Sequence, residues 1–184
     1  MRLTWWFSER FEDRTVERST KQSPAKRVSL KYEPNLHIVL FQPEIPQNTG
    51  AIGRTCVAIA AKLWLVRPLG FQLTEKSLRR AGLDYWQYLE WEIVDNWEDL
   101  NNKLDTRFWY FSKSATHCLY DATLEKGDAF VFGRESAGLP SDLLDTSNAN
   151  AIRIPIRSDV RSLNLSCSVA VAGYELVRQT DFRP

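Results

Sequence analysis

The sequence is poor in residues that form disulfides or bind transition metals. Among 184 residues there are three cysteines, Cys56, Cys118 and Cys167, and two histidines, His37 and His117. The cysteines are odd in number, far apart and without zinc-site spacing, which predicts reduced thiols in a cytoplasmic protein and no metal site. His117 and Cys118 are adjacent, so a strand would point them to opposite faces, and a Cys–His catalytic pair is disfavoured.

The sequence also lacks a long hydrophobic run and an excess of charge of one sign. Hydrophobic residues make up 43% of the chain and charged residues 26%, and no apolar segment is long enough to cross a bilayer. These values predict a soluble protein without a membrane segment. The net charge is +1, so any polyanion would have to be held by a local basic patch.

Residues 1–34 differ from the remainder of the chain. They mix charges of both signs with Ser and Thr, show no sustained hydrophobic period, and contain no continuous apolar segment of a secretory signal. We predict a loosely ordered N-terminal extension, followed by one domain over 35–184. The aromatic residues of the extension are candidates for docking on the domain or on a partner: Trp5, Trp6, Phe7 and Phe11.

From residue 35 onward, short apolar runs alternate with helical patterns. Strands are predicted at 36–41, 63–66, 90–94, 107–112, 128–133 and 151–156, and helices at 50–61, 74–82, 96–104, from near Pro140, and at 164–179. This alternation indicates an α/β fold with a mostly parallel sheet flanked by helices.

Three loops follow predicted strands and carry unusual residues. They cover 41–55, 132–140 and 154–166. Ligands of parallel sheets bind beyond the carboxyl ends of the strands, so these loops are the candidate site. Asn48 and Arg54 lie on either side of the start of the helix that follows the first loop.

The second loop reads FGRESAGLP. It is not the nucleophile elbow of a hydrolase, because Arg134 stands where a glycine should precede Ser136, and it has neither a dinucleotide nor a phosphate-loop glycine pattern. Two interpretations stay open. Gly133 and Glu135 form part of a ligand site, or the loop is only a turn into a helix.

The third loop contains Arg157, Arg161, Ser162 and Asn164 ahead of the longest predicted helix. Ser162 or Asn164 can cap that helix. The helix itself is rich in small residues, which suits packing against either the sheet or a second subunit.

Four ordered blocks of the sequence resemble the SPOUT class of RNA methyltransferases. They are PEIPQNTGAIGRTC (43–56), RPLGF with LRRAGLDYW (67–71 and 78–86), FGRESAGLP (132–140), and IRIPIRSDVRSLNLSCSVAVAGYE (152–175). The most similar branch methylates the ribose 2′-oxygen of the wobble cytidine or uridine of tRNA. The resemblance extends over about residues 35–180.

The resemblance implies a C-terminal trefoil knot, a homodimer whose active sites use both subunits, and S-adenosyl-L-methionine as cofactor. It assigns cofactor contacts to Phe111, Gly133, Ile154 and Ser162. It places Asn48, Arg54, Glu135 and Asn164 at the family's catalytic motif positions.

The family assigns activation of the ribose hydroxyl to the arginine that corresponds to Arg54. An arginine is not expected to lose its proton in a protein, because its pKa is above 12. Arg54 is therefore interpreted either as a literal base or as a clamp that orients the hydroxyl and stabilises negative charge on it.

Binding of tRNA by this family implies cationic phosphate contacts. Candidates are Arg79, Arg80, Arg157, Arg161 and Lys113.

Tyr174 matches a tyrosine near the dimer and cofactor region of the family. The chain departs from many relatives at Cys167 and Arg134, which are not motif anchors. Two alternatives stay open: methylation of another tRNA position or of rRNA, or an RNA-binding dimer without activity.

Overall fold

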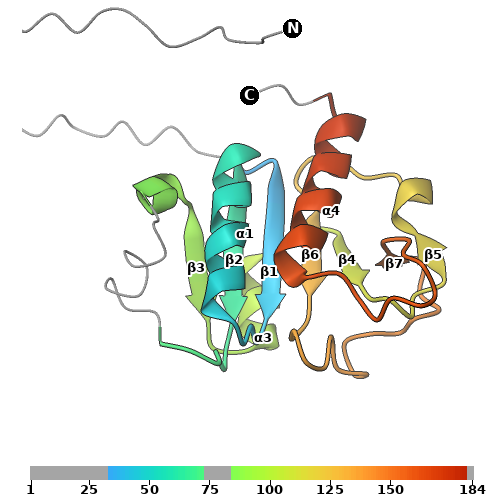
Figure 1. Cartoon of the computed structure of the whole chain (residues 1–184). Helices are drawn as coiled ribbons and strands as arrows, with labels where there is room; N and C mark the ends of the chain where they lie inside the picture. The colour runs from blue at the N-terminus through green and yellow to red at the C-terminus, as the bar shows by residue number, and fades with distance from the viewer. Residues whose placement is uncertain (1–32, 73–83, 182–184) are drawn as a thin grey trace, which may run out of the picture. The chain divides into compact units, whose positions relative to one another are not determined.

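The alternating apolar runs form one parallel sheet. The computed structural model describes residues 33–72 and 84–181, and in them seven strands pair in the order β3-β2-β1-β6-β4-β7-β5 (Figure 1). Every ladder in the described part is parallel. The strands are β1 (Leu36–Phe41), β2 (Ala61–Val66), β3 (Trp91–Val94), β4 (Phe108–Phe111), β5 (His117–Cys118), β6 (Ala129–Phe132) and β7 (Ala151–Arg153). The predicted α/β class with a mostly parallel sheet is confirmed.

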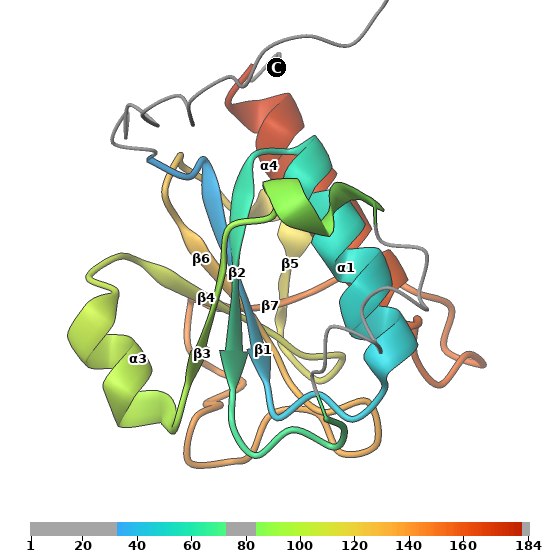
Figure 2. The ribbon, with the colours of Figure 1, turned by 90° about the vertical axis from the view of Figure 1, so that its left-hand side faces the viewer.

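Helices cover both faces of this sheet. The helices are α1 (Pro46–Ala58), α3 (Trp97–Lys103) and α4 (Leu165–Gln179), with short 3-10 helices η1 (Asp84–Tyr88) and η2 (Leu119–Asp121). α1 and α4 lie side by side on one face, and α3 lies on the other (Figure 2). The central strands β1, β2 and β6 are almost fully buried, as their near-continuous apolar sequences require.

Alternation along the strands divides the buried side chains into two cores. In β1, Leu36, Ile38 and Leu40 belong to the core beneath α1 and α4, whereas Val39 and Phe41 belong to the core beneath α3. The same division recurs in β2 and β6, because successive side chains of a strand point to opposite faces.

The small residues of α4 pack against α1. Ala172 and Gly173 are buried, and a Cβ atom built at Gly173 would lie 2.7 Å from Cδ1 of Ile59. The sequence left two partners open for this helix surface, the sheet or a second subunit. Within one chain, the sheet and α1 cover its buried side. Val171 and Tyr174 point elsewhere, with 37% and 54% of their surface exposed.

The predicted start of the first helix at residue 50 is wrong. α1 begins at Pro46, so Asn48 and Thr49 are buried within its first turns. Proline is well suited to this position, because the first helical residue needs no N–H partner and has the backbone angle that the proline ring imposes.

Two further boundaries also differ from the prediction. Instead of a helix near Pro140, the chain makes one turn in which the N–H groups of Leu143 and Leu144 both donate to the Pro140 carbonyl. The last strand ends at Arg153 and not at 156, because Pro155 cannot donate to a ladder. The helix predicted over 96–104 is confirmed, with the Asn96 side chain accepting the Asp99 N–H at 2.8 Å.

Some predictions lie outside the described residues. These are the extension with its aromatic residues, the helix at 74–82, and the phosphate contacts assigned to Arg79 and Arg80.

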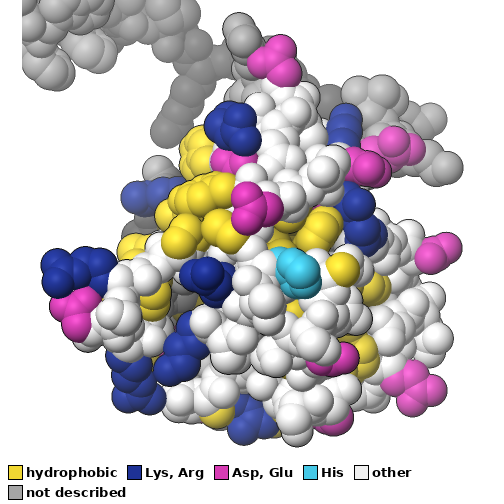
Figure 3. Space-filling view, turned by 90° about the vertical axis from the view of Figure 1, so that its right-hand side faces the viewer, with side chains coloured by type: hydrophobic (Ala, Val, Ile, Leu, Met, Phe, Trp, Pro, Cys, Tyr) yellow, Lys and Arg dark blue, Asp and Glu magenta, His cyan; other side chains and the backbone are white. Residues whose placement is uncertain are grey.

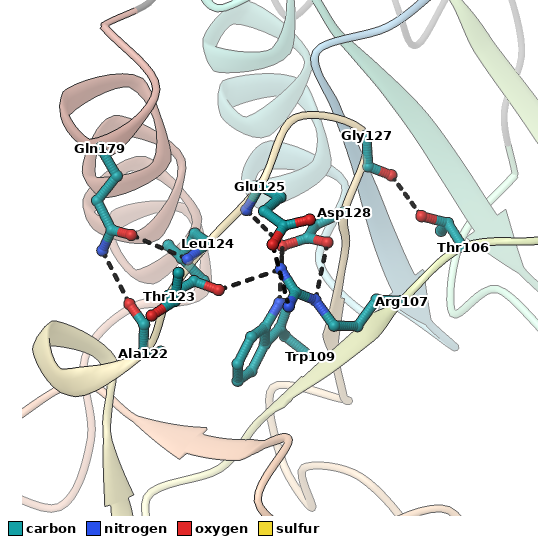
Figure 4. Close-up of polar contacts among 10 residues, drawn as sticks. All are labelled: Thr106, Arg107, Trp109, Ala122, Thr123, Leu124, Glu125, Gly127, Asp128 and Gln179. Atoms are coloured by element: carbon teal, nitrogen blue, oxygen red, sulfur yellow. Dashed lines mark hydrogen bonds and ion pairs between the residues drawn. The ribbon is translucent and has the colours of Figure 1, made fainter.

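A buried carboxylate organises the amino-terminal edge of the sheet. Asp128 is 3% exposed and accepts four hydrogen bonds: two from Arg107, at 3.0 and 2.7 Å, one from Trp109 Nε1 at 2.9 Å, and one from the Glu125 N–H at 2.8 Å (Figure 4). Gln179 of α4 completes the cluster through the backbone of residues 122 and 124. This carboxylate raises the pKa of Arg107, chiefly through their hydrogen bonds.

We expect Asp128→Ala to lower the free energy of unfolding by about 3 kcal/mol, because it leaves the Arg107 and Trp109 donors without their acceptor. Urea unfolding followed by circular dichroism measures this change. Asp142→Ala is the control, since Asp142 is solvent-exposed. Equal midpoints for the two variants would contradict the assigned role of Asp128.

Candidate active site

The loops that follow β1, β4, β6 and β7 meet at the carboxyl edge of the sheet around a cavity of about 530 Å³. The chain goes from β1 through α1 to β2 on one side, whereas from the neighbouring β6 it goes to β7 on the other side. Such a reversal of strand order is where parallel sheets bind ligands. The volume suits a molecule of cofactor size. The cavity lining includes these predicted site residues: Asn48, Phe111, Gly133, Glu135, Ile154, Arg161, Ser162 and Asn164.

The carboxylate of Glu135, on the loop that follows β6, caps the amino terminus of α1. The helix has no side-chain cap of its own at Ile45. Glu135 instead accepts the backbone N–H groups of Glu44 at 2.8 Å and Ile45 at 3.2 Å, and the Asn48 side-chain amide at 3.0 Å. An anion at a helix amino terminus satisfies free donors and interacts favourably with the helix dipole.

A second carboxylate, on the first loop, accepts hydrogen bonds from the second loop. Glu44 accepts the N–H of Ser136 at 2.9 Å and its hydroxyl at 2.8 Å. These two hydrogen bonds, with a smaller attraction from Arg134, lower the pKa of Glu44. The first and second loops are thus joined by two crossed carboxylate contacts, Glu135 to α1 and Glu44 to the second loop.

The third loop joins the same network through Asn164. Its amide nitrogen donates to Oδ1 of Asn48 at 3.0 Å, and its amide oxygen accepts the N–H of Ser166 at 2.8 Å. Asn164 is therefore the N-cap of α4, and Ser162 is not. Glu135, Asn48 and Asn164 form one chain of hydrogen bonds across the three loops.

Aromatic rings lie next to these polar groups. Phe111 at the end of β4 stacks on Phe132 of β6, with centroids 4.4 Å apart and ring planes 17° apart. Ile154 and Leu139 add apolar surface to the same lining. The cavity thus has an apolar wall beside a polar one, which fits a flat heterocycle with polar substituents.

The second loop turns back on itself over Gly133. Arg134 and Gly138 exchange backbone hydrogen bonds, and Gly138 has φ +72°. A Cβ atom at Gly133 would lie 2.0 Å from the carbonyl carbon of Gly138, closer than any side chain permits. Glycine at 133 is required for this turn whatever the cavity binds.

Cations lie at the opening of the cavity. Lys113, Arg134 and Arg161 line it and are exposed, and Glu135 is the only carboxylate in the lining. A side chain of Arg134 also donates to Gln42. Three cations thus border the cavity in a chain of nearly neutral charge.

Three predicted site residues are not part of this lining: Arg54, Arg157 and Tyr174. Arg157 forms an exposed ion pair with Asp159, with Nη2 to Oδ2 at 2.9 Å. Arg54 lies on the exposed side of α1, with its guanidinium carbon 4.6 Å from the centroid of the Tyr85 ring.

Sequence reasoning did not single out Glu44 or Ser136. PEIP gives a signal for the cap instead, because prolines at 43 and 46 leave Glu44 and Ile45 as the N–H donors ahead of the helix. These donors need an acceptor. The identity of that acceptor, 91 residues away for Glu44, has no local signature.

Within residues 33–72 and 84–181, no three His, Cys, Asp or Glu side chains are grouped closely enough to hold a metal ion. The same residues contain no helix that is long and apolar enough to span a membrane.

Comparison with known proteins gives consistent matches over the described domain. The model of the SpoU rRNA Methylase family matches residues 35–174. The tRNA (cytidine(34)-2′-O)-methyltransferase of Methylovorus glucosotrophus is 46% identical over 149 residues, which are 79% of this chain and 96% of that protein.

Solved structures also match this chain. One that concerns the 2-OH methylation of C/U34 on tRNA is 43% identical, with a TM-score of 0.73, and covers 78% of this chain and 95% of that one. The SpoU methyltransferase AviRb from Streptomyces viridochromogenes, solved with AdoMet, is 20% identical with a TM-score of 0.70, covering 83% of this chain and 63% of that one. The second similarity concerns the fold.

We expect Glu135→Ala to lower the free energy of unfolding by about 1–2 kcal/mol, because α1 loses its cap and the Asn48 amide loses an acceptor. Glu135→Gln retains one accepting oxygen and should lose less. Urea unfolding at neutral pH measures both. Glu90→Ala, at an exposed glutamate, is the control, and a Glu135→Ala midpoint equal to that of the control would refute the capping role.

Proposed function

Because the chain belongs to the SpoU rRNA Methylase family, we propose that it transfers a methyl group from S-adenosyl-L-methionine to the ribose 2′-oxygen of the wobble nucleotide of tRNA. The observation that carries the proposal is the hydrogen-bonded junction of Asn48, Glu135 and Asn164 at the wall of the cavity. Relatives that are 46% and 41% identical, each matched over 96% of its own length, bear the name of this activity.

The cavity fits the cofactor by its donor set and shape. Phe111, Leu139 and Ile154 would hold an adenine ring against apolar surface, and Ser162 offers a hydroxyl to the ribose. The tight turn at Gly133 exposes backbone where a side chain would otherwise fill the space. When bound, the cofactor supplies an electrophilic methyl group.

In this proposal the protein acts mainly by alignment. The ribose hydroxyl must be held in line with the methyl group while water is excluded from the cavity. Arg54 donates hydrogen bonds to the hydroxyl oxygen and stabilises the negative charge that develops on it as the hydroxyl proton passes to solvent at the opening of the cavity. A bidentate guanidinium also suits a neighbouring phosphate.

Arg54 lies outside the lining of the cavity in its own chain, which supports a homodimer in which it serves the cavity of the second copy. The proposed contact surface is the exposed side of α4, which carries Val171 and Tyr174, together with Leu163 just before the helix; each of the three is more than a third exposed. On the molecular face shown in Figure 3, hydrophobic side chains gather beside several Lys and Arg side chains.

tRNA would be held by cations at the opening of the cavity. Lys113 and Arg161 are the proposed phosphate contacts on one chain, and Arg157 becomes available if RNA displaces Asp159. The ion pair of Arg157 is highly exposed and is therefore worth little.

We also propose that the chain after β6 is threaded as a trefoil knot. Two features support this path. β7 pairs between β4 and β5, both of which precede it in the sequence. Asn164, which follows β7, returns to Asn48 beside the first strand.

We expect Arg54→Ala to lower kcat for methylation of bulk tRNA by about 100-fold. Arg54→Lys should lower kcat nearly as much, because a lysine lacks the planar pair of donors. Labelled S-adenosyl-L-methionine and nucleoside mass spectrometry measure the product at position 34, and calorimetry should give an unchanged cofactor Kd. Retention of activity with lysine would favour the literal base. Labelling of rRNA in place of tRNA would overturn the substrate assignment.

We expect Val171→Asp to shift the chain from dimer to monomer in sedimentation, because it places a charge in the proposed contact surface, and to abolish methyl transfer. Thr116→Asp, at an exposed site outside α4, is the matched control. A monomeric wild-type chain would refute the dimer.

A further inference from the structure

We propose that Tyr85 is a positioning residue that orients the guanidinium of Arg54 toward the ribose. The inference rests on the proposed function, since it concerns how the arginine assigned to the 2′-hydroxyl is held. Nothing in the three motif loops supplies this support. It comes from η1, the 3-10 helix between β2 and β3.

The contact itself is a cation over an aromatic face. The guanidinium carbon of Arg54 lies 4.6 Å from the centroid of the Tyr85 ring. Arg54 is exposed and Tyr85 is half-buried, so the ring is the more firmly held partner. Among the described residues, the Arg54 side chain has no hydrogen bond or ion pair, and the Tyr85 ring is the group that its guanidinium faces.

Gly53 of α1 and the backbone of Gly50 bring η1 close enough for this contact. A Cβ atom at Gly53 would lie 2.7 Å from Cζ3 of Trp86, so a side chain there would displace η1. Gly50 lies one turn before Arg54, and the Tyr85 hydroxyl donates to its carbonyl at 3.4 Å. The missing side chain at 53 and the hydrogen bond to the Gly50 carbonyl together set the position of the ring beside residue 54.

A ring is better suited to this task than a carboxylate. A carboxylate partner would occupy the in-plane N–H groups, whereas a ring contacts the face of the guanidinium and leaves all five donors free. Arg54 can therefore be oriented in advance and still donate two parallel hydrogen bonds to a ribose and its phosphate.

The test compares substitutions at 85 in the full-length protein. We expect Tyr85→Leu to lower kcat about tenfold, the scale of a partly desolvated cation–π contact, with the cofactor Kd within about twofold of wild type. Tyr85→Phe keeps the ring and should restore most of kcat. Tyr88→Leu, on the same short helix with a 73% exposed ring, is the matched control and should behave as wild type.

A second series guards against misfolding of the leucine variant. Phenylalanine analogues with one, two or three ring fluorines keep the size of the ring while weakening its negative face, so kcat should fall stepwise along the series. In an Arg54→Lys background, where the planar cation is gone, the slope of the series should be smaller.

The outcomes separate this inference from the proposed function. If wild type does not methylate tRNA, the function fails and Tyr85 has no reaction to support. If wild type is active but kcat is the same across the fluorinated series, or if Tyr85→Phe is as weak as Tyr85→Leu, the positioning role is wrong while the function stands.

Discussion

Two carboxylates on loops far apart in the sequence determine the shape of the candidate site. Glu135 accepts the free N–H groups at the start of α1, and Glu44, within that start, accepts the N–H and hydroxyl of Ser136. Each loop thus provides the acceptor that the other lacks. Asn48 and Asn164 extend this pairing to the third loop, so the cavity wall depends on contacts that no single segment can make alone.

Much of the fold was predictable because the strands are short, apolar and separated by clear helical periods. β1, β2, β3, β4 and β6 lie where the pattern places them. The errors have physical causes. The helix pattern is visible in the sequence only from Gly50, whereas the helix begins four residues earlier, at Pro46. β5 has two residues, too few for any hydrophobic period to be detected.

The candidate site was predictable at the level of loops and motif positions, not of partners. Asn48, Glu135 and Asn164 come together as the three-loop interpretation expected. The partners of Glu135 and Glu44 lie about 90 residues away in the chain, and the ring beneath Arg54 belongs to a segment between two strands. Such pairs arise from the strand order, which hydrophobic periodicity does not encode.

The remote cap of α1 has a consequence for how the chain folds. The first turn of this helix obtains its acceptor 91 residues later, after β6 has joined the sheet beside β1. A contact at such separation carries a loop-closure cost that a local contact does not, and it cannot form before the intervening chain has been made. During synthesis, the amino end of α1 therefore stays incomplete until most of the domain has left the ribosome, and the binding cavity is among the last features to form.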